Sequence, residues 1–235
     1  MKPFSNKGQP ESVGFRYEKK YLIEGLSAKD VISALKRHPC VFRVLYPARY
    51  VNNIYLDTPL LEDYFSNVNG NRLRKKVRVR WYHDLYRQVD DAVLEFKKKE
   101  GEVGSKEQYP FPPFASDTSL TEGHFRRLVE SSNLPPDVKY CLRGLEFAIM
   151  NRYCRWYFAT PGEEFRATVD ADLEFVHLGK LHNRFVKSHK ERKYLVLEIK
   201  YAVDNDRGFH RVSSALPFRI TRSSKYIAGV EHVYV

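Results

Sequence analysis

The chain has 235 residues, 43% hydrophobic and 14% aromatic, and its 40 lysines and arginines outnumber 29 acidic residues. This composition excludes intrinsic disorder over most of the length. No apolar run reaches the roughly 18 residues that a transmembrane helix needs. The formal net charge of +11 indicates a polyanionic partner: nucleic acid, anionic lipid, nucleotide or polyphosphate.

The sequence carries signs of a cytoplasmic protein. Residues 1–14 are expected to form a polar tail, because they lack the apolar core of a signal peptide. Cys40, Cys141 and Cys154 fit neither a disulfide framework nor a zinc-ligand spacing, which favours a reducing compartment. The eight histidines show no metal-ligand spacing either, so we expect ordinary surface or core roles for them. Without an internal repeat, residues 15–235 are expected to form one domain.

Alternation of apolar and polar residues predicts the strands, and capping residues predict the helices. In chain order, we expect a strand at 15–23, a helix from Ser27 to about 37, a strand at 50–57, a short helix from Thr58 to about 65, and strands at 72–82, 92–100 and 103–109. There follow a helix at about 121–132, a short helix after Pro136, strands at 147–159, 165–170 and 192–201, and a last helix from near Lys225. The basic segment 180–193 is expected to be a loop.

The strand at 72–82 has the most informative pattern. Its sequence RLRKKVRVRWY places five cations on one face: Arg72, Arg74, Lys76, Arg78 and Arg80. Like charges in a row on one face repel each other, which is a poor choice for a purely structural strand. The face is either simply solvated or built to bind an anion.

Several other strands share this division into an apolar face and a cationic face. An open sheet with helices on its apolar face would explain it, and so would a closed barrel with a polar lumen. The barrel would gather these cations around one cavity: Arg16, Lys20, Arg78, Arg80, Lys97, Lys106, Arg155, Arg166 and Lys200. The acids Glu18, Glu95 and Glu198 would then be ion-pair partners or ligands of a divalent cation. Asp170 is either a metal ligand or a partner of Arg166. This charge pattern favours a metal–triphosphate complex.

Eight short motifs in order resemble the catalytic domain of the vacuolar transporter chaperone (VTC) family, which are polyphosphate polymerases among the triphosphate tunnel metalloenzymes. The motifs are RYEKKY (16–21), IYLDT (54–58), KVRVRWY (76–82), LEFKKK (94–99), YCRWYF (153–158), RATVD (166–170), LEIKY (197–201) and SSKY (223–226). The resemblance runs from about residue 15 to 226, which is nearly the whole chain.

This resemblance implies an α+β fold: an eight-stranded antiparallel tunnel barrel with a basic lumen and helices packed outside. It implies binding of ATP or another triphosphate, and of Mn²⁺ or Mg²⁺. The phosphate ligands would be Lys20, Arg78, Arg80, Lys97, Lys106, Arg155, Arg166, Lys200 and Lys225. Glu198 would be the metal ligand, and Lys225 would close over the phosphates. A tunnel open at both ends would let the product thread out.

The sequence departs from the wider group of tunnel enzymes at Arg16, where they carry the first of two alternating glutamates. Fewer carboxylates suit a single metal ion and leave the role of Glu18 undecided between metal binding and an ion pair.

We therefore expect a polyphosphate polymerase that transfers the γ-phosphate of ATP to a phosphate or polyphosphate acceptor. The alternatives are a triphosphatase of the same fold and a non-catalytic polyphosphate-binding module. No specific nucleic acid is expected, because neither an aromatic stacking platform nor a helix-turn-helix is apparent. If the polymer is exported, a membrane protein partner must form the channel.

Overall fold

The computed structural model describes residues 13–101, 103–185 and 187–234. The predicted polar tail, residues 1–14, lies outside this range except for its last two residues, which begin the first strand. Within the described part of the chain, no helix is long and apolar enough to cross a membrane.

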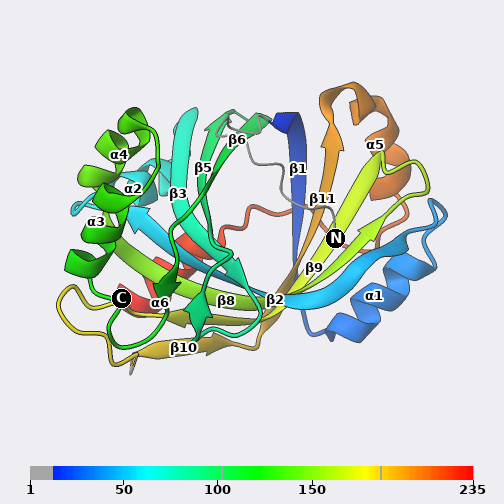
Figure 1. Ribbon diagram of the computed structural model, residues 1–235. Helices are drawn as coiled ribbons and strands as arrows, with labels where there is room; N and C mark the ends of the chain where they lie inside the picture. The colour runs from blue at the N-terminus through cyan, green and yellow to red at the C-terminus, as the bar shows by residue number, and fades with distance from the viewer. Residues whose placement is uncertain (1–12, 102, 186, 235) are drawn as a thin grey trace.

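A large antiparallel sheet dominates the described residues (Figure 1). Its strands, in sheet order, are β10 (Ser188–Glu191), β9 (Phe165–Val176), β11 (Tyr194–Ala202), β1 (Val13–Glu24), β6 (Val103–Pro110), β5 (Val93–Glu100), β3 (Leu73–Tyr82), β2 (Arg43–Asp57) and β8 (Glu146–Ala159). Strand β8 also pairs with β9, so that every strand except β10 takes part in a closed ring. The predicted ring of eight antiparallel strands is therefore confirmed, and the open sheet is excluded.

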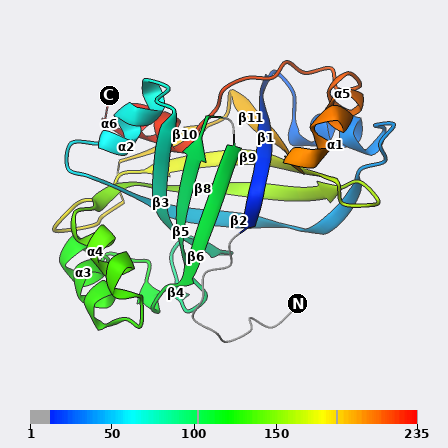
Figure 2. The same ribbon diagram turned by 90° about the horizontal axis from the view of Figure 1, so that it is seen from above.

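Helices pack against the apolar outer face of the ring, as the sequence predicts. Helices α3 (Glu122–Ser131) and α4 (Pro136–Arg143) cover one side, and α1 (Ala28–Lys36) and α5 (Asp206–Ser213) cover the other (Figures 1 and 2). Trp81, fully buried, packs edge-on against Phe114 in this outer layer. Burying these apolar faces fixes the register, since a slip of one residue would turn the charged face outward.

The last helix, α6 (Lys225–Tyr234), packs on the inner face of the sheet. Its residues Tyr226 and Val230 share a buried cluster with Tyr55 and Tyr153, whose strands β2 and β8 pair in the ring. A Cβ at Gly229 would lie 2.2 Å from Ile149 Cδ1, so only glycine allows so close an approach. The helix lies behind β3 in Figure 1.

Several elements differ from the predicted ones. Helix α2 (Glu62–Val68) begins later than predicted. Thr58 Oγ1 accepts a hydrogen bond from the backbone amide of Glu62 (3.1 Å), and the Asp57 carboxylate also caps the helix by accepting from the amides of Asp63 (3.0 Å) and Tyr64 (2.9 Å). The segment expected to be a loop contains β10, which pairs with a longer β9 than predicted. Strand β2 starts at Arg43, and three short elements were not predicted: β4 (Gln88–Val89), β7 (Phe114–Ala115) and the 3₁₀ turn η1 (Val203–Asn205). Helix α5 was also not predicted.

Candidate phosphate-binding site inside the ring

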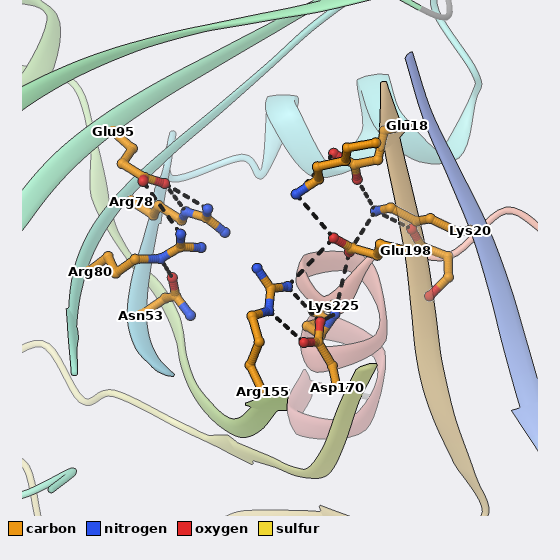
Figure 3. A network of polar contacts seen from close by, with 12 residues as sticks. Glu18, Lys20, Asn53, Arg78, Arg80, Glu95, Arg155, Asp170, Glu198 and Lys225 are labelled. Carbon is orange, nitrogen blue, oxygen red and sulfur yellow. Dashed lines mark hydrogen bonds and ion pairs between the residues drawn. The ribbon is translucent and has the colours of Figure 1, made fainter. Parts of the chain in front are cut away.

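Strand register brings charged side chains from several strands together on the inner face of the ring. Residues directly opposite each other on antiparallel strands point to the same face of the sheet. The cross-strand sets are Glu18–Lys200, Lys20–Glu198, Arg78–Glu95, Arg155–Asp170 and Lys76–Lys97–Lys106. Because helices cover the opposite face of these strands, these side chains point into the ring. Figure 3 shows seven of them: Glu18, Lys20, Arg78, Glu95, Arg155, Asp170 and Glu198.

Glu198 is at the centre of the largest group of ion pairs (Figure 3). Its carboxylate lies 3.3 Å from Lys200 Nζ, 3.5 Å from Arg155 Nη2, and 3.6 Å from both Lys20 Nζ and Lys225 Nζ. Burial alone would raise the pKa of Glu198, but these four cations hold it well below its ordinary value. The carboxylate is therefore ionised, and it shares its partners with neighbouring acids.

Asp170, which is fully buried, makes the shortest ion pairs of the site. Arg155 donates to both carboxylate oxygens, from Nε at 2.5 Å and from Nη2 at 2.6 Å, and Lys225 Nζ lies 2.5 Å from Oδ2. The sequence left Asp170 as a metal ligand or a partner of Arg166. The structure pairs it with Arg155 and Lys225 rather than with Arg166, so Asp170 orients these two cations toward Glu198.

Glu95 organises the opposite side of the ring. Arg78 donates to its Oε2 from Nε at 2.7 Å, and Arg78 Nη2 lies 2.6 Å from the same oxygen. The other oxygen, Oε1, accepts a hydrogen bond from Gln108 (2.9 Å) and lies 3.5 Å from Arg80 Nη1 and 3.6 Å from Lys106 Nζ. One buried carboxylate therefore anchors three cations whose remaining donors are available to an anion.

The segment 221–226 crosses one end of the ring. Thr221 pairs with Lys20 on β1, Lys20 Nζ donates to the Ser223 carbonyl (3.0 Å), Lys76 Nζ on β3 donates to Ser224 Oγ (2.8 Å), and Lys225 contacts Asp170 on β9. Strands β1, β3 and β9 are not neighbours in the ring, so the segment must span its end. At this end the structure differs from the expected tunnel, which was open at both ends.

Lys97 and Lys76 lie where cations outnumber carboxylates. Within the described residues, Lys97 makes neither a hydrogen bond nor an ion pair shorter than 4 Å. Burial and the neighbouring Arg78 hold the pKa of Lys97 well below that of a free lysine. Burial and Lys20 likewise lower the pKa of Lys76 to about 7. A bound anion would favour the charged form of both side chains.

Glu18 and Glu198 fit a divalent metal ion that is bound together with phosphate oxygens. Their carboxylates lie 3.0 and 3.6 Å from Lys20 Nζ, and 3.7 and 3.3 Å from Lys200 Nζ, so both border the same space. Magnesium is typically held by one or two carboxylates plus phosphate oxygens and water, and manganese accepts the same oxygen ligands. Without the metal, Glu18 pairs with these two lysines.

The structure brings together most of the predicted site residues: Lys20, Arg78, Arg80, Lys97, Lys106, Arg155, Glu198, Lys200 and Lys225. Arg166 is not among them, because its side chain is 47% exposed and pairs with Glu163 at 2.7 Å. Lys76 belongs to the cluster although it was not among the candidate ligands. The alternation of the strand at 72–82 had already placed it on the charged face.

Comparison with known proteins assigns this ring to a family. A family model of the VTC domain matches residues 15–234. The chain belongs to the VTC domain family. Among curated proteins, none matches this VTC domain significantly. The resemblance that its eight motifs carry is therefore confirmed over nearly the whole chain.

Solved structures share the fold of this VTC domain at low sequence identity. A Pyrococcus horikoshii protein is 12% identical with a TM-score of 0.52, over 92% of this chain and 98% of that protein. A conserved hypothetical protein from Pyrococcus furiosus is 14% identical with a TM-score of 0.51, over 90% and 99% of the two chains. These likenesses support the tunnel-like fold alone.

Proposed function

We propose that this VTC domain is a polyphosphate polymerase, which transfers the γ-phosphate of ATP to a phosphate or polyphosphate acceptor inside the ring. One observation carries the proposal: the charge of the inner face. Nine basic side chains line it, namely Lys20, Lys76, Arg78, Arg80, Lys97, Lys106, Arg155, Lys200 and Lys225, against the four carboxylates Glu18, Glu95, Asp170 and Glu198. An excess of cations in a buried site is stable only with an anion of matching charge.

Membership of the VTC domain family supports the same activity, because the motifs that carry the resemblance are those of polyphosphate polymerases. The proposed phosphate ligands come from several elements, among them β3 with Arg78 and Arg80, β8 with Arg155 and α6 with Lys225. A linear triphosphate can therefore be contacted from several sides at once.

The residues of the site would act mainly through electrostatics. Arg78, Arg80 and Arg155 present guanidinium groups that are held in place by Glu95 and Asp170, so they need little reorganisation to stabilise charge on the transferring phosphoryl group. A general base is not required, since the oxygen of an acceptor phosphate is already ionised. A divalent ion held by Glu198 and Glu18 would add positive charge at the phosphoryl oxygens.

The unequal ends of the ring suggest one direction for the product. The segment 221–226 lies across one end and contributes Lys225 to the site. A growing polymer would therefore leave by the opposite end.

The test is incubation of the purified protein with ATP and Mn²⁺ or Mg²⁺, with polymer resolved on a gel stained for polyphosphate and ADP and free phosphate assayed in parallel. A ladder of polymer with matching ADP is expected. Free phosphate without polymer would replace the polymerase with a triphosphatase of the same fold. Binding of ATP without turnover would leave a polyphosphate-binding module.

A further inference from the structure

A second group of ligand-type side chains lies outside the inner cluster, between β10 and the end of α6. His189 and Glu191 lie on β10, and His232 lies in the last turn of α6. Their ligand atoms all lie within 4.8 Å of one another. The register pairs His189 with Phe175 and Glu191 with Leu173, and these two apolar residues pack in the cluster that includes α6. Both β10 side chains therefore face the helix.

The three groups converge on one carboxylate oxygen. Glu191 Oε2 lies 3.7 Å from His189 Nε2 and 3.5 Å from His232 Nε2. The other oxygen of Glu191, Oε1, accepts a hydrogen bond from the backbone amide of Lys193 at 2.6 Å, which orients the carboxylate. The two imidazole rings stack with their centroids 3.9 Å apart. Each ring thus turns the same nitrogen toward the same oxygen.

Two features of this group lack an explanation within the fold. The side chain of Glu191 is only 5% exposed, yet neither neighbour of Oε2 is a permanent cation. His189 Nε2 is buried and has no hydrogen-bond partner among the described residues. A buried carboxylate and a buried ring nitrogen are both costly unless a partner satisfies them. A cation between them would satisfy both at once.

We propose that His189, Glu191 and His232 form a binding site for a transition-metal ion of the zinc class, separate from the Mg²⁺ or Mn²⁺ of the inner cluster. Two imidazoles and one carboxylate suit zinc, whereas magnesium and calcium prefer oxygen ligands alone. Tetrahedral zinc with bonds of 2.0–2.2 Å needs ligand atoms about 3.3 Å apart, close to the two distances to Glu191 Oε2. Because His232 is partly exposed, the fourth position is open to water.

The site would fasten the C-terminal end of α6 to the sheet. The same helix begins with Lys225, which contacts Asp170 and Glu198 in the ring. With a bound ion at its last turn, α6 would be held at both ends, and the ion would stabilise the folded chain whatever reaction the ring performs. The proposal is independent of the polymerase activity.

The test uses the full chain, stripped with a chelator and then titrated with Zn²⁺ against a chromophoric indicator in excess Mg²⁺, which occupies oxygen-ligand sites. One Zn²⁺ per chain is expected, and His189→Gln and His232→Gln should each lower the affinity at least 10-fold. His210→Gln, an exposed histidine on α5, is the matched control and should bind as the wild type does. Circular dichroism establishes that each variant is folded.

Thermal stability and the visible spectrum of bound Co²⁺ test the same site. Zn²⁺ at about 100 times its Kd should raise the Tm of the wild type by roughly 5–10 °C, and that of His232→Gln much less. Co²⁺ in place of Zn²⁺ should give the visible bands of a four-coordinate site, which both variants lose. Absence of Zn²⁺ binding in excess Mg²⁺, or equal binding by the wild type and both variants, would overturn the assignment.

Discussion

Lys76 offers a quantitative test of the inner cluster. Burial and the nearby Lys20 lower its pKa to about 7, and its ammonium group donates to Ser224 Oγ on the segment that crosses the ring. The free protein therefore loses this charge as the pH rises above 7. A triphosphate bound nearby favours the charged form, so binding should be accompanied by proton uptake.

The size of the effect follows from the lowered pKa. At pH 8, a lysine with a pKa of about 7 is roughly 90% neutral, so full recharging on binding takes up about 0.9 proton. The association constant for ATP should accordingly fall as the pH rises above 7, by up to about tenfold per pH unit from this group. Lys97, whose pKa is also lowered, adds to the uptake.

The assay is isothermal titration of ATP at pH 8 without divalent metal, in buffers of different ionisation enthalpy, with Lys76→Met compared to the wild type. The variant should take up about 0.9 proton less. Lys75→Met is the matched control, because the neighbouring Lys75 is 55% exposed and lies 4.0 Å from Asp63. Equal uptake by Lys76→Met and the wild type would refute the reasoning.

The remaining predictions concern three other positions. Glu198→Gln should abolish turnover, because the amide lacks the negative charge with which a carboxylate holds a metal ion, but ATP binding should remain measurable by titration. Unchanged turnover would show that Glu198 is not the metal ligand. Arg80→Ala should weaken ATP binding about 10- to 100-fold, for a charged hydrogen bond of about 1.5–3 kcal/mol, whereas the exposed Arg126→Ala should not. Gly229→Ala should lower the Tm by roughly 2–12 °C in calorimetry, because the added Cβ would clash with Ile149 and overpacking costs about 1–3 kcal/mol. An unchanged Tm would contradict the position of α6.

Local sequence was sufficient for the eight strands of the ring and for the faces they present. The alternation around Arg78 and Arg80 predicted a charged face, and the structure places both side chains against Glu95 inside the ring. The capping sequence at Ser27 predicted α1, whose capping box is present. At α2 the local sequence predicted the cap Thr58, which accepts from the Glu62 amide, but not the second cap, Asp57 at the end of β2. The two side chains accept from different amides of the first turn, and the sequence alone does not show that both are used.

The sequence by itself determined the cationic strand faces, the apolar faces that helices cover and membership of the VTC domain family. These depend on periods of two and 3.6 residues, which neighbouring residues set. Only the tertiary structure decided that β8 pairs with β2 as well as with β9, which closes the ring, that Asp170 pairs with Lys225, and that His232 meets His189 and Glu191. Such contacts join residues far apart in the chain, and the packing of whole helices and strands determines which of these residues meet.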